Sequence, residues 1–428
     1  LLFGTADENN PMKLTSITFN NFDTSNVTNM TGMFNFCTSL TSLDISNFDT
    51  SKVIDMRLMF NHCSSIKTLD ISSLNTANVL DMAAMFQMCT SLTSINLSTL
   101  NTSKVTDMQY LFAFCNKLTS IQLHGSFNTS NVTNMMSMFI DCSSLITLDL
   151  SSFDTSMVTK MRLMFNGCEK LIQLDLSSFD TSNVTDMVFM FMGCESLTTL
   201  DRSNFNTGKV KEMWYMFSSC SSLTSLDLSN FNTSKVINMD SMFSDCSSLT
   251  TLDLSNFDTS KVTNMWKMFS SCTSLTSLNL SSFNTSKVTN MWKMFSDCTS
   301  LTTLDLSNFD TSKVTIMEGM FYNCTSLKQL DLSSFNMENV TNSYSDMLDF
   351  GGANQIKLLK TPKNAPANLP IGTDSILFYN GAVVTSVPAG LKESRTYTNV
   401  IPANAILPNT WKEEVANSTY MTVNGTTT

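Results

Sequence analysis

The spacing of the cysteines constrains the fold of this chain more than any other feature of its sequence. The twelve cysteines recur at a step of 26 residues, except for one step of 27 between Cys115 and Cys142. They are Cys37, Cys63, Cys89, Cys115, Cys142, Cys168, Cys194, Cys220, Cys246, Cys272, Cys298 and Cys324. A fixed period of this size is typical of stacked supersecondary units. The sequence therefore predicts a solenoid, and most of the chain belongs to it.

One repeat predicts a strand, a turn and a short helix. The repeat that begins at Cys246 reads CSSLTTLDLSNFDTSKVTNMWKMFSS. Leu252 and Leu254 alternate with polar residues, as in a strand with one apolar face. Met265, Met268 and Phe269 follow at spacings that suit a short helix with one apolar stripe. The D-T-S segment between them supplies small polar side chains that are suited to capping the first turn of that helix.

A repeat of this size cannot bury its apolar side chains alone, whereas stacked repeats share one core. Strands of neighbouring repeats, about 4.8 Å apart, would form a parallel sheet. We interpret the 31 methionines as core filler, because an unbranched thioether packs irregular gaps. The cysteines hold one repeat position, so we expect a column of buried free thiols rather than disulfides, which need a particular Cβ geometry. No C-x-x-C pair accompanies them, and no zinc site is predicted.

The repeated phrase V-T-N-M-x-x-M-F-x-x-C-x-x-L-x-x-L-D-L-S-x-F-D-T-S resembles the BspA-like leucine-rich repeats of bacterial surface proteins. The resemblance covers roughly Leu14 to Leu358, and its many copies make it specific. It implies an α/β solenoid: a leucine-rich-repeat horseshoe with a parallel β-sheet on one face and short helices on the other. It also implies an extracellular, bacterial cell-surface location, often an adhesive role, and no catalytic residues.

The sequence divides into three predicted regions. Residues 1–13 form an irregular lead or cap, and residues 14–360 form the solenoid, with about twelve full repeats and degenerate ends. Residues 361–428 hold most of the prolines and are predicted to be a small β-rich cap or junction. Within that region, a hairpin is predicted around Asn380-Gly381, and a further strand at Tyr420–Val423.

Three departures from the repeat carry their own predictions. His124-Gly125 contain the extra residue, expected in a bulge or wide turn with His124 as a solvated residue. Arg202 replaces a core leucine, and either it reaches an edge or a carboxylate, or it marks a soft spot in the stack. Phe350 keeps the phase of the cysteines, so Ile356 and Leu358 are expected to form the next L-x-L strand.

Composition narrows the function classes. A net charge of −11 argues against a nucleic-acid groove and against docking on anionic lipid. No run of 18 apolar residues exists, so no insertion of this segment into a membrane is predicted. The chain begins Leu1-Leu2-Phe3, and we expect a segment of a longer precursor, with its signal peptide and anchor not included. Without a nucleophile–base pair, a phosphate loop or an H-E-x-x-H motif, we predict no enzyme, no cofactor and no metal centre.

The first candidate surface is a column of aspartates on the polar side of the predicted strands. Stacked carboxylates are expected to raise one another's pKa. Two interpretations stay open: the column binds cations, a glycan or a protein, or its carboxylates only accept hydrogen bonds from neighbouring Ser and Thr and keep the face soluble. The column is Asp44, Asp70, Asp149, Asp175, Asp201, Asp227, Asp253, Asp305 and Asp331, of which Asp175, Asp201, Asp227, Asp253 and Asp305 are the candidate ligand-binding residues.

The second candidate surface is the pair of residues that follows the first methionine of each M-x-x-M-F segment. This pair varies from repeat to repeat while its surroundings stay constant. It supplies Trp214, Tyr215, Trp266 and Trp292, which we predict to form an aromatic strip suited to stacking on a glycan or to a protein hot spot. Packing between adjacent repeats is the equally weighted alternative.

These features predict an adhesion or ligand-recognition module that binds a protein or glycan of a host or neighbouring cell. Binding would use the concave strand face or the aromatic edge, with affinity from many weak repeated contacts. Two alternatives remain: a structural stalk without a ligand of its own, and an assembly module stabilised by cations.

Overall fold

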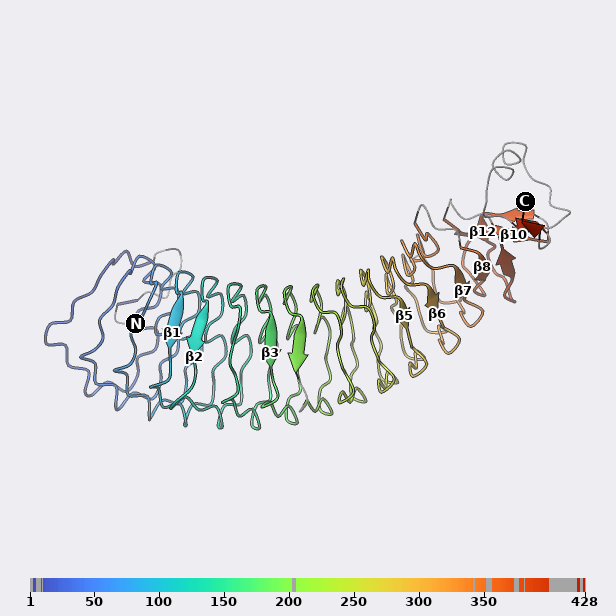
Figure 1. Cartoon of the computed structure of the whole chain (residues 1–428). Coiled ribbons are helices and arrows are strands. Elements are labelled where there is room, and N and C mark those ends of the chain that lie inside the picture. The colour runs from blue at the N-terminus through green and yellow to red at the C-terminus, as the bar shows by residue number, and fades with distance from the viewer. Residues whose placement is uncertain are drawn as a thin grey trace. The chain divides into compact units, whose positions relative to one another are not determined.

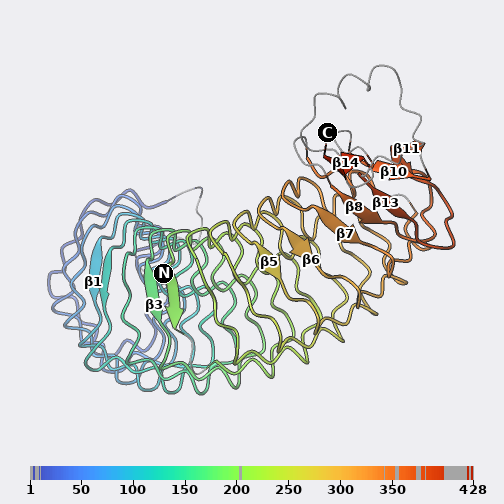
Figure 2. The same ribbon diagram turned by 45° about the vertical axis from the view of Figure 1, so that its right-hand side comes forward.

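The structure is a computed structural model that describes residues 3–4, 9, 11–201, 205–341, 343–351, 356–372, 377–380, 382–399, 422–423 and 426–427. The chain forms two compact units, which we call unit 1 (Leu1–Leu226) and unit 2 (Asp227–Thr428). Within each unit the chain runs in successive coils, each stacked on the one before it (Figures 1 and 2). A solenoid of repeated coils is therefore the architecture of both units.

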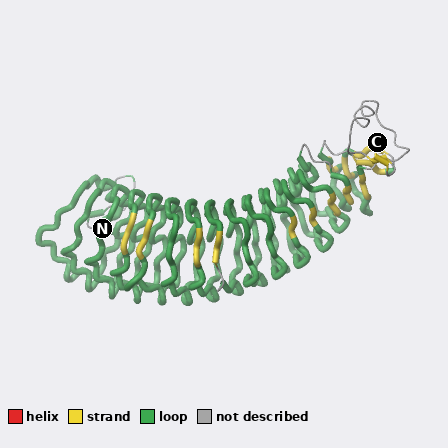
Figure 3. Tube along the Cα trace, in the orientation of Figure 1, coloured by secondary structure: helices red, strands yellow, loops and turns green. Residues whose placement is uncertain are grey.

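The L-x-L segments form short parallel strands, as the alternation of leucine and polar residues predicts. Paired residues lie one repeat apart, for example Ile95 opposite Ile121 in unit 1 and Leu278 opposite Leu304 in unit 2. Figure 3 shows these strands as brief segments in a chain that is otherwise loops and turns. The parallel pairs are β1 (Ser94–Asn96) with β2 (Ser120–Gln122), β3 (Gln173–Asp175) with β4 (Thr199–Asp201), β5 (Ser277–Leu278) with β6 (Thr303–Leu304), and β7 (Gln329–Asp331) with β8 (Leu358–Lys360).

The predicted short helices do not form in the described residues, so the α/β class was wrong (Figure 3). The M-x-x-M-F segments are runs of turns in which alternate N–H groups point to different partners. The N–H groups of Met56 and Leu58 donate to the carbonyls of Asp81 and Ala83 in the next coil, each at 3.0 Å, whereas Met59 donates back to Met56 within its own turn. The described residues include no helix with the length and apolar character needed to cross a membrane.

The spacing of the coils explains why no helix forms. Stacked phenylalanine rings of successive coils lie 5.6 Å apart at Phe34 and Phe60 and 5.8 Å apart at Phe243 and Phe269. An α-helix with its side chains is about 10–12 Å wide, so helices cannot follow one another at this spacing. Three-residue turns place side chains at i and i+3 on one side much as a helix does. The sequence pattern therefore resembled that of a helix.

This backbone route places two residues of each coil in the left-handed region. In the coil that begins near Val53 they are Leu58 (φ 56°) and His62 (φ 57°). Such a conformation costs a residue with a Cβ roughly 1–2 kcal/mol, so hydrogen bonds to the next coil must offset it. Glycine occupies the same positions at Gly32, Gly167 and Gly193.

A second parallel ladder runs beside these turns, at the residue that precedes the first methionine, and sequence reasoning did not identify it. Its members pair one residue per coil. In unit 1 they are Asn29, Asp55, Asp81, Asp107, Asn134, Lys160, Asp186 and Glu212, and in unit 2 they are Asn238, Asn264, Asn290 and Ile316.

The core confirms the predicted role of methionine and cysteine. Met268, Phe269 and Cys272 are fully buried, and equivalent residues of other coils are buried as well. All twelve cysteines are free thiols, as predicted. Eleven of the Sγ atoms lie close to a phenylalanine carbonyl that precedes them by one coil, as between Cys272 and Phe243 at 3.1 Å. Burial raises the pKa of Cys89 to about 12, so the thiolate is strongly disfavoured.

The threonine of each D-T-S segment is buried and links two coils. Thr259 is fully buried, its hydroxyl donates to the carbonyl of Asn284 at 3.0 Å, and the N–H of Asn284 donates to the same oxygen at 2.7 Å. Sequence reasoning assigned these residues to a helix cap. Their role is instead to satisfy backbone groups of the next coil.

The sheet of the last coil continues into the C-terminal region of unit 2. Its strand order is β11-β10-β13-β8-β7, where β10 is Leu377–Tyr379, β11 is Ala382–Val384 and β13 is Thr396–Thr398. The hairpin predicted around Asn380 is confirmed, since Tyr379 pairs with Ala382 in antiparallel register. Further antiparallel pairs are β9 (Leu369–Pro370) with β12 (Ser386–Val387), and β14 (Thr422–Val423) with β15 (Thr426–Thr427).

The register of the degenerate last coil differs from the prediction. Leu330 pairs with Leu359, 29 residues later, rather than with Ile356. Ile356 is buried but precedes the strand, so the predicted L-x-L of Ile356 and Leu358 was wrong. The three-region division stays a prediction.

The one-residue insertion lies in a turn, as expected. Gly125 has a φ of 102°, and the next residue, Ser126, donates its N–H to the carbonyl of Ser98 in the preceding coil at 2.8 Å. Arg202 lies outside the described residues.

We predict that Thr259→Val destabilises unit 2 by about 2–3 kcal/mol, because two backbone groups of Asn284 lose their partner in a buried site. The matched control is Thr263→Val, which removes only one exposed hydroxyl bonded to a backbone carbonyl at 3.3 Å. Urea unfolding followed by circular dichroism measures both. Equal stability losses in the two variants would contradict the role of the buried threonines.

Candidate functional site

The aspartates of the strand face hold the turn that follows each strand. The side chain of Asp253 accepts the N–H of Ser255 at 2.9 Å, and Asp227 and Asp305 accept the N–H groups two residues ahead at the same distance. Asp175 has the same geometry with Ser177. The side chain of Asp201 lies outside the described residues.

The pKa values of these carboxyls move opposite to the expected direction. Hydrogen bonds from the backbone and side chain of Ser255 lower the pKa of Asp253, although the nearby Asp227 acts to raise it. Asp305 is lowered by Ser307 in the same way. Mutual repulsion is therefore the weaker effect, because each exposed carboxylate is stabilised locally. The column is first of all a set of turn-forming residues, and ligand binding by it stays a prediction.

His124 has a partner that sequence reasoning missed. Its Nε2 lies 2.8 Å from a carboxylate oxygen of Asp149 in the next coil, and both side chains are exposed. Hydrogen bonds from Ser151, and then from His124, lower the pKa of Asp149 to about 2. The hydroxyl of Ser151 also donates to Asp149, at 2.7 Å. In the described part of the chain, no cluster of three His, Cys, Asp or Glu side chains is arranged to hold a metal ion.

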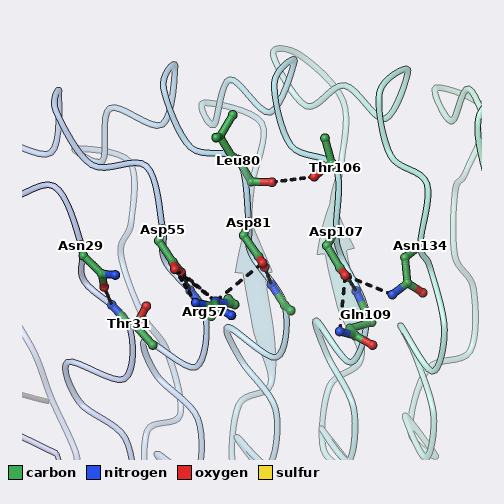
Figure 4. A network of polar contacts seen from close by, with 11 residues as sticks. Asn29, Thr31, Asp55, Arg57, Leu80, Asp81, Thr106, Asp107, Gln109 and Asn134 are labelled. Carbon is green, nitrogen blue, oxygen red and sulfur yellow. Dashed lines mark hydrogen bonds and ion pairs between the residues drawn. The ribbon is translucent and has the colours of Figure 1, made fainter.

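The second ladder is acidic in part of unit 1, and Figure 4 shows its network. Arg57 contacts Asp55 at 2.7 Å and Asp81 of the next coil at 3.6 Å. Asn134 donates to Asp107 at 3.0 Å. Burial, and then Asp107, raises the pKa of Asp81, whereas Arg57 opposes that rise. The carboxylates here are engaged by neighbouring side chains of the same ladder.

The first aromatic cluster lies in unit 1. Trp214 contacts Phe189 edge to face with ring centroids 4.5 Å apart, and Tyr215 lies 5.1 Å from Phe189. The guanidinium of Arg162 lies over the ring of Trp214 at 5.1 Å and over that of Phe189 at 5.6 Å. We call Arg162, Phe189, Trp214 and Tyr215 the unit 1 aromatic cluster.

Carboxylates of the second ladder hold Arg162 in that cluster. Its guanidinium is 3.7 Å from Asp186. Burial, and then Asp186, raises the pKa of Glu212, and Arg162 opposes the rise. The cation is thus shared between two acids and two rings, which fixes its position.

The second aromatic cluster lies in unit 2. Trp266 and Trp292 belong to successive coils, and their ring centroids are 5.3 Å apart. The ammonium of Lys267 lies 5.9 Å from Trp266 and 5.1 Å from Trp292, and that of Lys293 lies 5.0 Å from Trp292. We call these four residues the unit 2 aromatic cluster.

The predicted aromatic strip is therefore two clusters in two units, each half-buried and each in contact with cations of the same chain. Packing between adjacent repeats accounts for part of their burial, which was the alternative interpretation. Sequence reasoning missed Arg162, Lys267 and Lys293 as members. The signal was available, because all three belong to the variable pairs.

We predict that the Asp149→Asn variant loses less stability than the parent protein when the pH is lowered. The folded-state pKa of Asp149 lies below its ordinary value, so its stabilisation is present above about pH 4 and is lost as the pH falls toward 2. Since the group is exposed, the effect should be at most about 1 kcal/mol. Urea unfolding at neutral and acidic pH measures it.

The reverse change is the matched control. Asn96 accepts the N–H of Ser98 at 2.9 Å with the same geometry, so Asn96→Asp should make stability more dependent on pH. An Asp149→Asn variant that loses as much stability as the parent on acidification would contradict the assignment.

Comparison with solved structures found similar repeat proteins. A leucine-rich repeat protein from Bacteroides ovatus is 18% identical, covers 74% of this chain and 75% of its own, and has a TM-score of 0.41. A leucine rich cell surface protein from Faecalibacterium prausnitzii is 20% identical over 58% of this chain and 75% of its own, with a TM-score of 0.32. The search of curated proteins found no match.

The family comparison covers most of the chain. The model described as "Mycoplasma protein of unknown function, DUF285" matches residues 3–123, 91–197, 115–224, 172–273 and 247–358, which together include every cysteine repeat. The chain belongs to the DUF285 family, and it is a BspA-like leucine-rich repeat protein, as the repeated phrase predicts.

Proposed function

We propose that this chain is an extracellular recognition module of a bacterial surface protein, which binds a protein or glycan through its aromatic clusters. One observation carries the proposal: the residue pair that varies most between repeats supplies half-buried aromatic side chains at Trp214, Tyr215, Trp266 and Trp292, whereas the core positions around it repeat. A stack that needed only stability would have no reason to vary this pair, since the neighbouring methionines and phenylalanines supply the core.

The chemistry of the clusters supports this role. Tryptophan, tyrosine and arginine are the residues that dominate binding energy at interfaces. Trp214 and Trp266 are half-buried, so each ring is positioned by its neighbours before any ligand arrives. Such preorganisation lowers the entropy lost on binding.

The strand face is the second contact surface in this proposal. Its aspartates are exposed and remain ionised to low pH, because turn N–H groups stabilise the charge of Asp175, Asp253 and Asp305. A ligand that lies across several coils would meet the same polar group at each coil. Many weak contacts of that kind add to a usable affinity.

The likeness to BspA-like repeat proteins supports the location in this proposal. BspA-like repeats imply a bacterial surface protein, and a glycan or matrix protein of a host or neighbouring cell is the partner that such a location makes available. The proposal assigns no catalysis and no cofactor to this segment.

The test is an array of glycans and matrix proteins probed with the intact chain. We expect one or more ligands to bind, and the triple variant Trp214→Ala, Trp266→Ala and Trp292→Ala to lose at least about 2 kcal/mol of binding free energy, the scale of interface hot spots. Ile172→Ala is the control, because it removes an exposed apolar side chain outside both clusters.

Circular dichroism melting must show that the triple variant is folded. If the array yields no ligand, or if the folded triple variant binds as well as the parent, the module has no recognition site in these clusters. A structural stalk that spaces other domains from the cell wall would then be the better description.

A further inference from the structure

Two neighbouring coils of unit 2 carry the same seven residues, KVTNMWK, at 261–267 and 287–293. These two segments hold four lysines and two tryptophans but no acidic residue, in a chain whose net charge is −11. The corresponding segments of unit 1 differ from each other, for example KVIDMRL at 52–58 and KVTDMQY at 104–110, and several include an acid of the second ladder. The basic character is therefore local to unit 2.

The lysine row at the start of these segments extends over four coils. In each of these coils an exposed lysine precedes the buried valine. The four lysines are Lys235, Lys261, Lys287 and Lys313. Stacked core rings of these coils are 5.8 Å apart, so the row offers one cation per coil at about that interval.

The same position in unit 1 is organised differently. There asparagine alternates with lysine, except that Met157 takes one lysine position, and Lys52 and Lys104 each donate to the asparagine of the preceding coil at 2.8 Å. In unit 2 no asparagine separates the four lysines. Among the described residues no hydrogen bond or close ion pair holds their ammonium groups, although Lys261 and Lys287 help to lower the pKa of the Asp258 carboxyl, after the hydrogen bonds of Ser260. Four like charges held side by side repel one another, and an anionic ligand relieves that repulsion.

A second row of cations runs parallel to the first. It consists of Lys267 and Lys293, whose ammonium groups lie over the indole rings of Trp266 and Trp292 at 5.0–5.9 Å. Each indole thus positions a cation rather than presenting an open face. The exposed Thr263 lies between the two rows along its coil, and its hydroxyl donates to the carbonyl of Ile237 at 3.3 Å.

Carboxylates border this surface, and one of them, Asp240, accepts a hydrogen bond from Asn264 of the central segments at 2.8 Å. Asp258 and Asp310 precede the lysine row, and their side chains accept the N–H groups of turn serines at 2.9 Å. Asp240 and Glu318 lie in the flanking coils. We call the surface formed by 235–241, 261–267, 287–293 and 313–319 the Lys–Trp face; it holds six lysines and two acids.

We propose that the Lys–Trp face binds an acidic linear polysaccharide, one that carries carboxylate or sulfate groups along its length. This inference deepens the proposed recognition function and rests on it. The repeat of one lysine per coil fits a polymer with charge at every sugar or every second sugar. The hydroxyls of Thr263 and Thr289 donate to carbonyls of the preceding coil, so their oxygens remain able to accept hydrogen bonds from sugar hydroxyls. A single-stranded nucleic acid fits less well, because it needs open aromatic faces for base stacking and these are covered by lysine.

The experiment measures binding of the intact chain to dextran sulfate, polygalacturonate and uncharged dextran by isothermal titration calorimetry at about 50 and 200 mM salt. We expect one or both of the charged polymers to bind, and dextran not to bind. The variant Lys261→Gln, Lys267→Gln, Lys287→Gln and Lys293→Gln should weaken binding about tenfold or more and flatten its salt dependence.

The matched control removes four exposed lysines of unit 1, as Lys52→Gln, Lys104→Gln, Lys170→Gln and Lys209→Gln, and should change affinity by less than about twofold. Equal losses in the two variants would show attraction to any lysine and would overturn the proposal. Tighter binding to an oligothymidylate than to either charged polysaccharide would assign the face to nucleic acid instead.

This experiment and the test of the recognition function can fail independently of each other. If neither charged polymer binds while the array ligand depends on the tryptophans, the recognition function stands and the polysaccharide assignment fails. If no charged polymer binds and the array is also empty, both fail.

Discussion

The structure depends on hydrogen bonds between coils more than on hydrogen bonds within them. A coil of about 26 residues has no helix in which to satisfy its backbone, so alternate N–H groups, such as that of Leu58, donate to the next coil. Buried threonines complete the arrangement, since a hydroxyl such as that of Thr259 serves both the N–H and the carbonyl of Asn284. Each coil is therefore complete only when another lies against it, which is the condition for a cooperative stack.

Close stacking determines which residues are tolerated. Phenylalanine rings of successive coils are 5.6–5.8 Å apart, so side chains at the same position of neighbouring coils touch. The residues of such a column must therefore be able to lie in contact with one another. Apolar columns meet this condition by packing, and polar columns meet it by pairing, as Lys52 does with Asn26. Aspartates on the strand face meet it because each charge is stabilised by its own turn, as Asp253 is by Ser255.

The sequence predicted the parts of this fold that depend on periodicity. The repeat length, the leucine strands, the free thiols and the methionine core all follow from which side chains recur. It did not predict the turns of the M-x-x-M-F segment, because spacings of three and four residues are shared by helices and successive turns. Whether a helix or successive turns form depends on the distance between coils, and that distance cannot be read from the sequence of one repeat.

The candidate surfaces also have features that the sequence predicted and features that only the structure shows. The variable pairs were identifiable because the rest of the repeat is constant, and Trp214, Trp266 and Trp292 were found in that way. Arg162 belongs to a variable pair as well, but its contact with Trp214 needed coordinates, because the two residues are two coils apart. The opposite pKa directions of Asp81 and Asp253 also needed coordinates, since they depend on burial and on which N–H group each carboxylate accepts.

The buried thiols have a consequence for how such a protein matures. In an oxidising environment, twelve cysteines in one chain would ordinarily form disulfides, with the risk of incorrect pairing. Here every cysteine sulfur is buried in the core. A buried thiol such as that of Cys89 stays protonated, and a protonated thiol is too weak a nucleophile to exchange with other thiols or disulfides. Folding to this native state therefore includes no disulfide-forming step, and the buried thiols of the folded protein are shielded from oxidants.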